Sequence, residues 1–345
     1  MTDRVAINSP QRIAQLDGLR GLAACVVALL FHARLLYGDV PNPFEGVPVI
    51  GWFQVYGWAF VDLFFVLSGV VFAQTYLDGW QLRRGTTAGQ FVLARIARLW
   101  PLHLAVLAFT VLLLRTDPDT TPGNVTLAAL MLQAAIQNPT EVLNGPAWSL
   151  SVEIFAYAVF LAAALARPAL FKAVAVAAIL YGAIAVAANG VWGALLGRGL
   201  MGFFVGVLVL RNLDILRRTP VWLLVPVALL PAFLPPDGAW LIATTLLAWP
   251  ALIVLSLRQA WLAASAMVWL GGRSYAVYLL HVPVYTLLGN LGMQAGASST
   301  AGWLAITGAA WLLILLLANI AYLRLERPAQ AAIRSWAERA SPALA

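Results

Sequence analysis

Charge is scarce in this sequence. Asp, Glu, Lys and Arg make up only 10% of the 345 residues, whereas about a quarter of a typical soluble domain is charged. Hydrophobic residues make up 62% of the chain, and the mean hydropathy is +0.86. So little polar surface cannot coat a water-soluble fold of this size. The composition therefore excludes a soluble globular protein and predicts an integral membrane protein.

Several chemical motifs are also missing. The single cysteine, Cys25, excludes an internal disulfide and any metal site built from several cysteines. The chain has no HExxH pattern and no glycine-rich phosphate loop, so the sequence gives no support to metal-dependent or nucleotide hydrolysis. We expect no metal and no nucleic acid partner. No internal repeat is visible, which weakens a secondary-transporter interpretation without removing it.

Long apolar stretches dominate what remains. A bilayer core requires about 20 mostly apolar residues per helix. Ten stretches of roughly that length are bounded by charge, Pro or Gly: 17–37, 57–76, 99–115, 147–166, 169–188, 191–210, 221–236, 239–257, 274–292 and 302–323. The seventh contains Pro226 and Pro231, which favour a kinked or partial span. The sequence thus predicts an all-α membrane protein with about ten transmembrane helices.

The basic residues indicate the orientation of these helices. Short cytoplasmic loops collect Lys and Arg. With the N-terminus inside, the inner segments hold 17 of the 21 basic residues, whereas the outer segments carry mainly acidic ones. Both termini are therefore predicted to be cytoplasmic. The longest inner loop is 77–98 and the longest outer one 116–146. Within the latter, 125–137 is too short to span the bilayer and is predicted to be an external or re-entrant helix.

Ionisable residues inside apolar stretches are candidates for function, because a charge in hydrocarbon costs a few kcal/mol or more. Counting about 1.5 Å per residue from the helix ends places four of them roughly 8–10 Å below the outer surface, so that they could share one pocket. These are His32, Asp62, Glu153 and Arg198. Asp62 has the alternative role of capping its helix.

A second group of ionisable residues lies nearer the cytoplasm and is mainly cationic, which suits an anionic ligand from the cytosol. Its members are Arg20, Arg95, Arg98, His103, Arg273 and His281. The arginines have an alternative role as anchors at the headgroups. His103 follows Trp100 and Pro101 at a predicted helix end, and this position favours an interfacial role.

These residue types fit two kinds of function. A histidine beside a carboxylate can act as a general base on a hydroxyl group, and Arg, Trp N–H or Ser hydroxyl groups can stabilise the oxyanion of an acyl transfer. The same groups could relay protons in a transporter of an anionic or acylated precursor. The residues by themselves leave these alternatives open.

Five motifs narrow the choice. They are LDGLRGLAA (16–24) with Phe31-His32, VDLFFVLSG (61–69), RIARLWPL (95–102), NGPAWSLSVE (144–153) and SYAVYLLHVP (274–283). In this order they closely resemble the acyltransferase 3 family, over about residues 12–328. The resemblance implies one transmembrane acyltransferase domain over 12–328, followed by a short cytoplasmic tail at 329–345.

The resemblance also implies an activity. Members of this family are ten-helix proteins of the bacterial cytoplasmic (inner) membrane that transfer acyl groups, usually acetyl from acetyl-coenzyme A, to hydroxyl groups of envelope carbohydrates or glycolipids. By matching positions, His32 is expected to be catalytic, with Asp62 and Glu153 as further catalytic residues. The residues expected to handle the acyl donor are Arg20, Arg95, Arg98 and His281.

The first motif departs from the family pattern. The family has ten residues between its arginine and histidine, whereas Gly21 to Phe31 makes eleven here. At about 100° per residue, the extra position turns Arg20 and His32 about 120° apart on a regular helix. We therefore expect a π-bulge that absorbs one residue, since such bulges often occur at functional sites. The alternative is that Arg20 does not approach the donor.

Two mechanisms remain open at this point: direct deprotonation of the acceptor hydroxyl by His32, or prior acylation of His32 itself. A transporter and an inactive membrane scaffold are the alternatives from other classes of protein. The sequence does not identify the acceptor, the acyl group or the oligomeric state.

Overall fold

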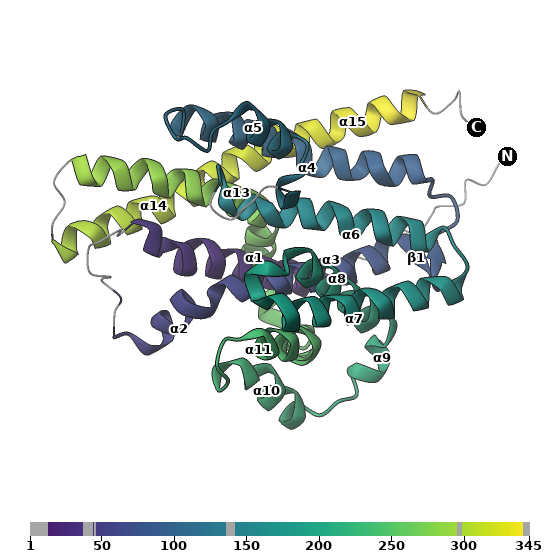
Figure 1. Cartoon of the computed structure of the whole chain (residues 1–345). Coiled ribbons are helices and arrows are strands. Elements are labelled where there is room, and N and C mark those ends of the chain that lie inside the picture. Colours follow the sequence, from purple (N-terminus) through teal and green to yellow (C-terminus); the bar gives the residue numbers. More distant parts are fainter. Residues whose placement is uncertain (1–12, 37–43, 45, 136–141, 295–298, 341–345) are drawn as a thin grey trace. The chain divides into compact units, whose positions relative to one another are not determined.

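The computed structural model describes residues 13–36, 44, 46–135, 142–294 and 299–340. These residues are almost entirely helical (Figure 1). Among them, 7 helices are long and apolar enough to cross a membrane. The predicted class, an all-α integral membrane protein, is therefore confirmed. The total of about ten spans and the cytoplasmic location of both termini stay predictions.

The first half of the chain contains six α-helices, a short hairpin and several 3-10 or π-helical segments, labelled η. In order, they are α1 (Ala14–Cys25), η1 (Val26–Phe31), η2 (His32–Leu36), α2 (Pro48–Tyr56), η3 (Gly57–Ala59), α3 (Phe60–Tyr76), β1 (Leu77–Asp78), β2 (Gln81–Leu82), α4 (Ala88–Leu113), α5 (Pro122–Ala129), η4 (Gln133–Ala135), η5 (Gly145–Ala147) and α6 (Trp148–Ala164). The two strands pair antiparallel, with Leu77 opposite Leu82.

In the described residues of the second half, every regular element is a helix. Its elements are α7 (Pro168–Gly193), α8 (Leu195–Arg211), α9 (Leu213–Leu216), α10 (Val221–Leu229), η6 (Leu230–Ala232), α11 (Gly238–Ala243), η7 (Thr244–Ala248), α12 (Trp249–Ser256), η8 (Ala260–Ala263), α13 (Ser265–Gln294), α14 (Thr300–Ala321), η9 (Tyr322–Glu326) and α15 (Arg327–Ala340). Helices thus lie on each of the ten stretches that the sequence predicts. The seventh is short and broken after Leu229, as its prolines predict.

Two boundaries differ from the prediction in a way that matters for the site. α4 begins at Ala88, eleven residues before the predicted start at 99, because Thr87 and Gln90 form a capping box. α13 begins at Ser265, nine residues before the predicted 274. Apolar content locates the part of a helix that lies in the membrane, whereas capping chemistry decides where the helix starts. Arg95, Arg98 and Arg273 therefore lie within helices and not in loops.

The chain divides into two compact units, and some helices contribute residues to both. The first unit takes its residues from the ranges 1–19, 62–85 and 158–268, and the second from 20–61, 86–157 and 269–345.

In the first unit, α3 and α8 approach each other so closely that their glycines leave no room for a side chain. A Cβ added at Gly69 would collide with the carbonyl of Phe203, and one at Gly206 with the carbonyl of Val66. Small residues allow helix backbones to meet in this way in membranes, where lipid is as apolar as leucine. The glycine that ends the VDLFFVLSG motif is therefore a packing residue.

In the second unit, α13 is hydrogen-bonded to other elements through the side chain of Tyr275 and the backbone carbonyl of Leu279. Tyr275 donates its hydroxyl hydrogen to the carbonyl of Leu99 on α4, at 2.7 Å. Leu279 accepts a bond of 2.8 Å from the amide of Asn144, just before α6. α15 packs against α4 (Figure 1). The helix that carries His281 is thereby fixed against α4 and the start of α6.

The glycine contacts give a testable prediction. Replacing Gly206 with alanine should destabilise the protein by about 1–3 kcal/mol or more, because the new methyl group meets backbone that cannot turn away. Gly308 on α14 is the matched control: nothing lies within 4 Å of its added Cβ, so alanine there should be neutral or stabilise by up to about 1 kcal/mol. Thermal unfolding in detergent measures both. Equal stability of the two variants would refute the close packing.

Candidate functional site

Two histidines from distant parts of the sequence meet in the second unit. Nδ1 of His32 lies 2.9 Å from Nε2 of His281, and the ring centroids are 4.7 Å apart. His281 is completely buried, whereas His32 is half-buried. A hydrogen bond between two imidazoles fixes the tautomer of each ring, because one nitrogen must donate and the other must accept. Such a pair can take part in acid-base chemistry, and His32 is its more exposed member.

A π-helical turn places His32 in this position. The segment η1 (Val26–Phe31) lies between α1 and His32, which begins the 3-10 segment η2. The predicted π-bulge between Arg20 and His32 is therefore confirmed. The turn absorbs the additional residue that distinguishes this chain from the family pattern.

Tyrosines hold His281 and the π-helical turn together. Tyr285 donates its hydroxyl hydrogen to the carbonyl of Ala28, inside the turn, at 2.6 Å. Tyr278 bonds the carbonyl of Pro146 at 2.8 Å. Both rings lie beside the imidazole of His281: the ring centroid of Tyr278 is 5.8 Å from that of His281, and the centroid of Tyr285 is 6.2 Å away. α13 thus carries both His281 and Tyr285, the residue that bonds the π-helical turn before His32.

The contact between His281 and His32 corrects the predicted depth of His281, which the sequence analysis placed nearer the cytoplasm than His32. Its predicted role in handling the donor stays a prediction. Counting residues from helix ends assumes straight helices. α13 contains Pro283, and the first span changes from α- to π- to 3-10 helix before and at His32. Both features bend a helix or alter its rise. The structure consequently brings together two histidines that residue counting separates.

Asp62 has a different partner, in the first unit. Its two carboxylate oxygens accept hydrogen bonds from Arg198, at 3.1 Å to Nε and 2.7 Å to Nη2. Both side chains are fully buried. Arg198 also lies 5.2 Å from the ring centroid of Trp192. The sequence analysis places Asp62 and Arg198 at similar depth but does not pair them.

Glu153 lies half-buried on α6 in the second unit. The catalytic roles assigned to Asp62 and Glu153 stay predictions.

Arg95 and Arg98 share one face of α4, as their spacing of three requires. The guanidinium of Arg95 lies 5.9 Å from the ring centroid of Tyr157, and that of Arg98 lies 5.2 Å from that of Tyr275. Arg98 also forms an ion pair with Glu326, which is only 1% exposed. The sequence analysis missed Glu326. A lone carboxylate beside an apolar span, between Arg324 and Arg327, is the signal that could have found it.

The other two arginines of the group predicted to lie nearer the cytoplasm have different surroundings. Arg20 is half-buried on α1. Arg273 is 9% exposed and donates from Nε to the side-chain oxygen of Asn319 at 2.8 Å. Its guanidinium carbon lies 4.3 Å from the ring centroid of Trp269 and 4.5 Å from that of Tyr322. Stacked and hydrogen-bonded in this way, Arg273 holds α13 against α14 and η9.

His103 is not interfacial, so this expectation is wrong. It is only 3% exposed, and its Nε2 lies 2.7 Å from the carbonyl of Ala128 on α5. The error follows from the early start of α4, which places His103 in the middle of a helix and not near its end. The predicted short helix within 125–137 is present as α5 and η4, as far as the described residues extend, and it packs against α4.

Comparison with known proteins assigns the chain to a family. A family model described as "Acyltransferase domain" matches residues 13–321. A relative from Rhizobium radiobacter, named "Protein 2 in picA locus", is 36% identical over 172 residues, which cover 44% of this chain and 82% of the relative. No solved structure gives a significant match.

The buried ion pair generates a prediction. Arg198→Met alone should destabilise the protein by about 3–5 kcal/mol, because it leaves the Asp62 carboxylate buried without its cation. The double variant Asp62→Leu/Arg198→Met should recover much of that loss, since no charge remains. Thermal unfolding in detergent measures both variants. If the loss of stability in the double variant equals the sum of the losses in Arg198→Met and Asp62→Leu, the two groups do not act as a pair.

Proposed function

The chain belongs to the acyltransferase family to which its five motifs point, and we propose that it is a membrane O-acyltransferase. In this proposal it moves an acyl group, usually acetyl, from acyl-coenzyme A on the cytoplasmic side to a hydroxyl group of an envelope or exported carbohydrate. The acyltransferase domain extends over 12–328, with a short cytoplasmic tail at 329–345. The protein resides in the bacterial cytoplasmic membrane.

The observation that carries this proposal is the hydrogen bond between His32 and His281. A general base needs an imidazole nitrogen that carries no proton. If Nδ1 of His32 donates to Nε2 of His281, Nε2 of His32 is left unprotonated and can accept a proton from a substrate. The opposite arrangement would put a proton on Nε2 of His32 and block it. His281 is therefore proposed to set the tautomer of His32, as the carboxylate does in a hydrolase triad.

The proposed reaction proceeds through this nitrogen. Nε2 of His32 takes the proton of the acceptor hydroxyl while the hydroxyl oxygen attacks the thioester carbonyl. The carbon–sulfur bond then breaks, and the proton passes from His32 to the leaving thiolate. In the two-step alternative, Nε2 itself attacks the thioester carbonyl, and the carbon–sulfur bond breaks to release the thiolate. The acceptor hydroxyl then attacks the acyl-histidine, the carbon–nitrogen bond breaks, and the hydroxyl proton passes to the thiolate. Both routes produce one ester and one free thiol.

The other site residues have proposed roles as well. Arg20, Arg95 and Arg98 are proposed to handle the donor, with its phosphates on Arg95 and Arg98. Glu326 would then compete with those phosphates for Arg98. Asp62 is proposed to act through its ion pair with Arg198, and Glu153 is proposed as the carboxylate of the catalytic group.

The central test is acyl transfer itself. Membranes containing the protein, incubated with acetyl-labelled acetyl-coenzyme A, should pass label into glycan or lipid-linked sugar. His32→Ala should abolish this label, because it removes the base in one mechanism and the acyl carrier in the other. Leu35→Ala, an exposed residue of the same 3-10 segment, should leave transfer unchanged. Transfer by His32→Ala at the normal rate would contradict both mechanisms, and substrate movement without transfer would favour a transporter.

The ion pair of Arg98 predicts opposite effects of two substitutions on donor binding. Arg98→Ala should weaken coenzyme A binding about 10- to 100-fold, because a charge-assisted bond to phosphate contributes about 1.5–3 kcal/mol. Glu326→Gln should strengthen binding, because it removes the anion that competes with the phosphates. Equilibrium binding of coenzyme A to the purified protein measures both. Unchanged affinity in Arg98→Ala would remove this residue from the donor site.

A further inference from the structure

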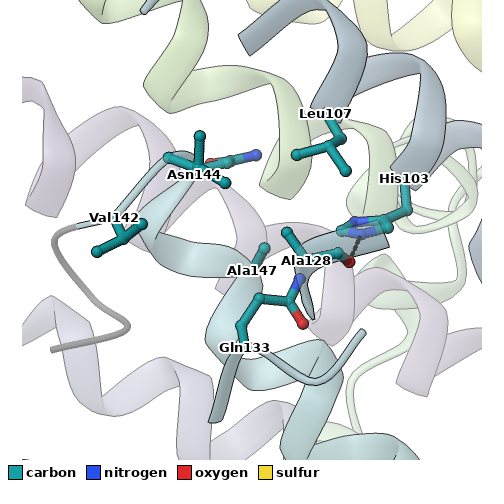
Figure 2. Close-up of a pocket in the computed structure, with 8 residues that line it drawn as sticks. His103, Leu107, Ala128, Gln133, Val142, Asn144 and Ala147 are labelled. Carbon is teal, nitrogen blue, oxygen red and sulfur yellow. Dashed lines mark hydrogen bonds between the residues drawn. The ribbon is translucent and has the colours of Figure 1, made fainter. Parts of the chain in front are cut away.

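The second unit contains a small pocket whose lining does not include His32 or His281 (Figure 2). Its walls come from α4, α5, η4 and the residues that lead into α6. Most of the lining is apolar, but His103, Gln133 and Asn144 also line it. They are 3%, 5% and 7% exposed. Three deeply buried polar side chains around one small pocket require an explanation.

Several of these polar atoms lack a partner. Within the part of the chain that the structure describes, neither Oε1 nor Nε2 of Gln133 has a hydrogen bond, and Oδ1 of Asn144 has none either. A buried polar group left unpaired costs about 1–3 kcal/mol. Buried polar groups in folded proteins are nearly always paired, and an orphaned one commonly marks an unseen water or ligand. Three such atoms at one pocket therefore indicate a polar occupant.

The backbone around the pocket is strained. Met131 and Leu143 both have φ of 54°, and among the described residues they are the non-glycine positions with positive φ. Leu143 lines the pocket, and Met131 lies two residues before Gln133. Left-handed backbone at such residues costs about 1–3 kcal/mol and tends to occur at functional sites. Here it orients the segments that bear the two amides.

The hydrogen-bond donors and acceptors of the lining indicate which chemical group the pocket would bind. Nε2 of His103 must carry a proton, since its partner is the carbonyl of Ala128. Gln133 offers one amide donor and one acceptor, and Asn144 offers an acceptor. The described lining residues include no Lys, Arg, Asp or Glu, so none of them would balance a charged group. A hydroxyl group, which both donates and accepts, matches these unpaired atoms.

One hydrogen bond links a lining residue of the pocket to the helix that carries His281. The amide nitrogen of Asn144 donates to the carbonyl of Leu279, at 2.8 Å. Leu279 lies two residues before His281 on α13. The free space is about 10 Å³, close to what one water molecule or one hydroxyl group requires. The pocket thus has room for one hydroxyl group of a ligand whose remainder lies outside it.

We propose that this pocket binds one hydroxyl group of a neutral, hydroxyl-rich acceptor and so anchors a carbohydrate beside the histidine pair. This inference rests on the proposed function and names its acceptor subsite: the amides of Gln133 and Asn144. In the absence of acceptor, one water molecule takes the place of the hydroxyl group.

Gln133→Met distinguishes this binding role from a structural one. Methionine has nearly the volume of glutamine but no hydrogen-bonding amide, so the variant should be as stable as the unmodified protein or more stable. Thr126→Val is the matched control, since it removes an exposed hydroxyl group from α5, whose bond goes to the carbonyl of Pro122 in the same helix. Gln133→Asn keeps the amide on a side chain that is one methylene shorter. If the methionine variant does not fold, the response of Gln133→Asn to sugar is compared with that of the control.

The melting temperature in detergent is measured with and without glucose, galactose, rhamnose and N-acetylglucosamine. Because sugars also stabilise proteins by exclusion from their surface, only differences between variants count. At least one sugar should raise the melting temperature of the unmodified protein and of Thr126→Val by about 2 °C more than that of Gln133→Met. His32→Ala should respond like the unmodified protein.

Three results would overturn the proposal. In the first, no sugar raises the melting temperature of the control more than that of Gln133→Met. In the second, a sugar raises the melting temperature of Gln133→Met as much as that of the unmodified protein. In the third, Gln133→Met has a lower melting temperature without sugar, and no sugar changes the difference between the variants. Because His32→Ala retains the pocket, sugar binding tests the acceptor subsite, and label transfer tests the acyltransferase separately. A protein that transfers label but fails the sugar test would keep the proposed function and lose this subsite.

Discussion

Polar groups placed among apolar helices must find partners on other helices, because little water is available to them. The hydrogen bond between His32 and His281 is the instance on which the site depends. It joins the N-terminal span to α13, and Tyr285 strengthens the same connection by bonding the π-helical turn that precedes His32. In the proposed mechanism, a bond that fixes the fold at this point also fixes the tautomer of the imidazole of His32, so that packing and chemistry share one interaction.

The same constraint explains the other ionisable residues. Asp62 and Arg198 neutralise each other in the first unit. In the second, Glu326 pairs with Arg98, and Arg273 stacks on Tyr322 while it bonds Asn319. A residue that looks catalytic because it is costly to bury can thus have a structural partner. The pocket lined by Gln133 and Asn144 differs from these pairs, since three buried polar atoms of its two amides have no hydrogen-bond partner among the described residues.

The sequence predicted features that depend on local pattern. Apolar stretches located the helices, and eleven residues in place of ten between Arg20 and His32 predicted the π-helical turn. It could not predict pairs between distant segments, such as Arg98 with Glu326, because nothing local records which helix faces which. Nor could it predict the depth of His281, since counting residues ignores the bends that π-helical turns and prolines introduce. The buried position of His103 was missed because a capping box extends α4 beyond its apolar part.

The tautomer of His32 is the central claim, and it can be measured directly. The chain has only 3 histidines, so the imidazole nitrogens of ¹⁵N-histidine-labelled protein can be assigned with single substitutions. The account predicts neutral rings with the proton of His32 on Nδ1, an unprotonated Nε2 of His32, and an unprotonated Nε2 of His281 that accepts the bond. A proton on Nε2 of His32 would contradict the account, because that nitrogen could then neither accept a proton nor attack a thioester.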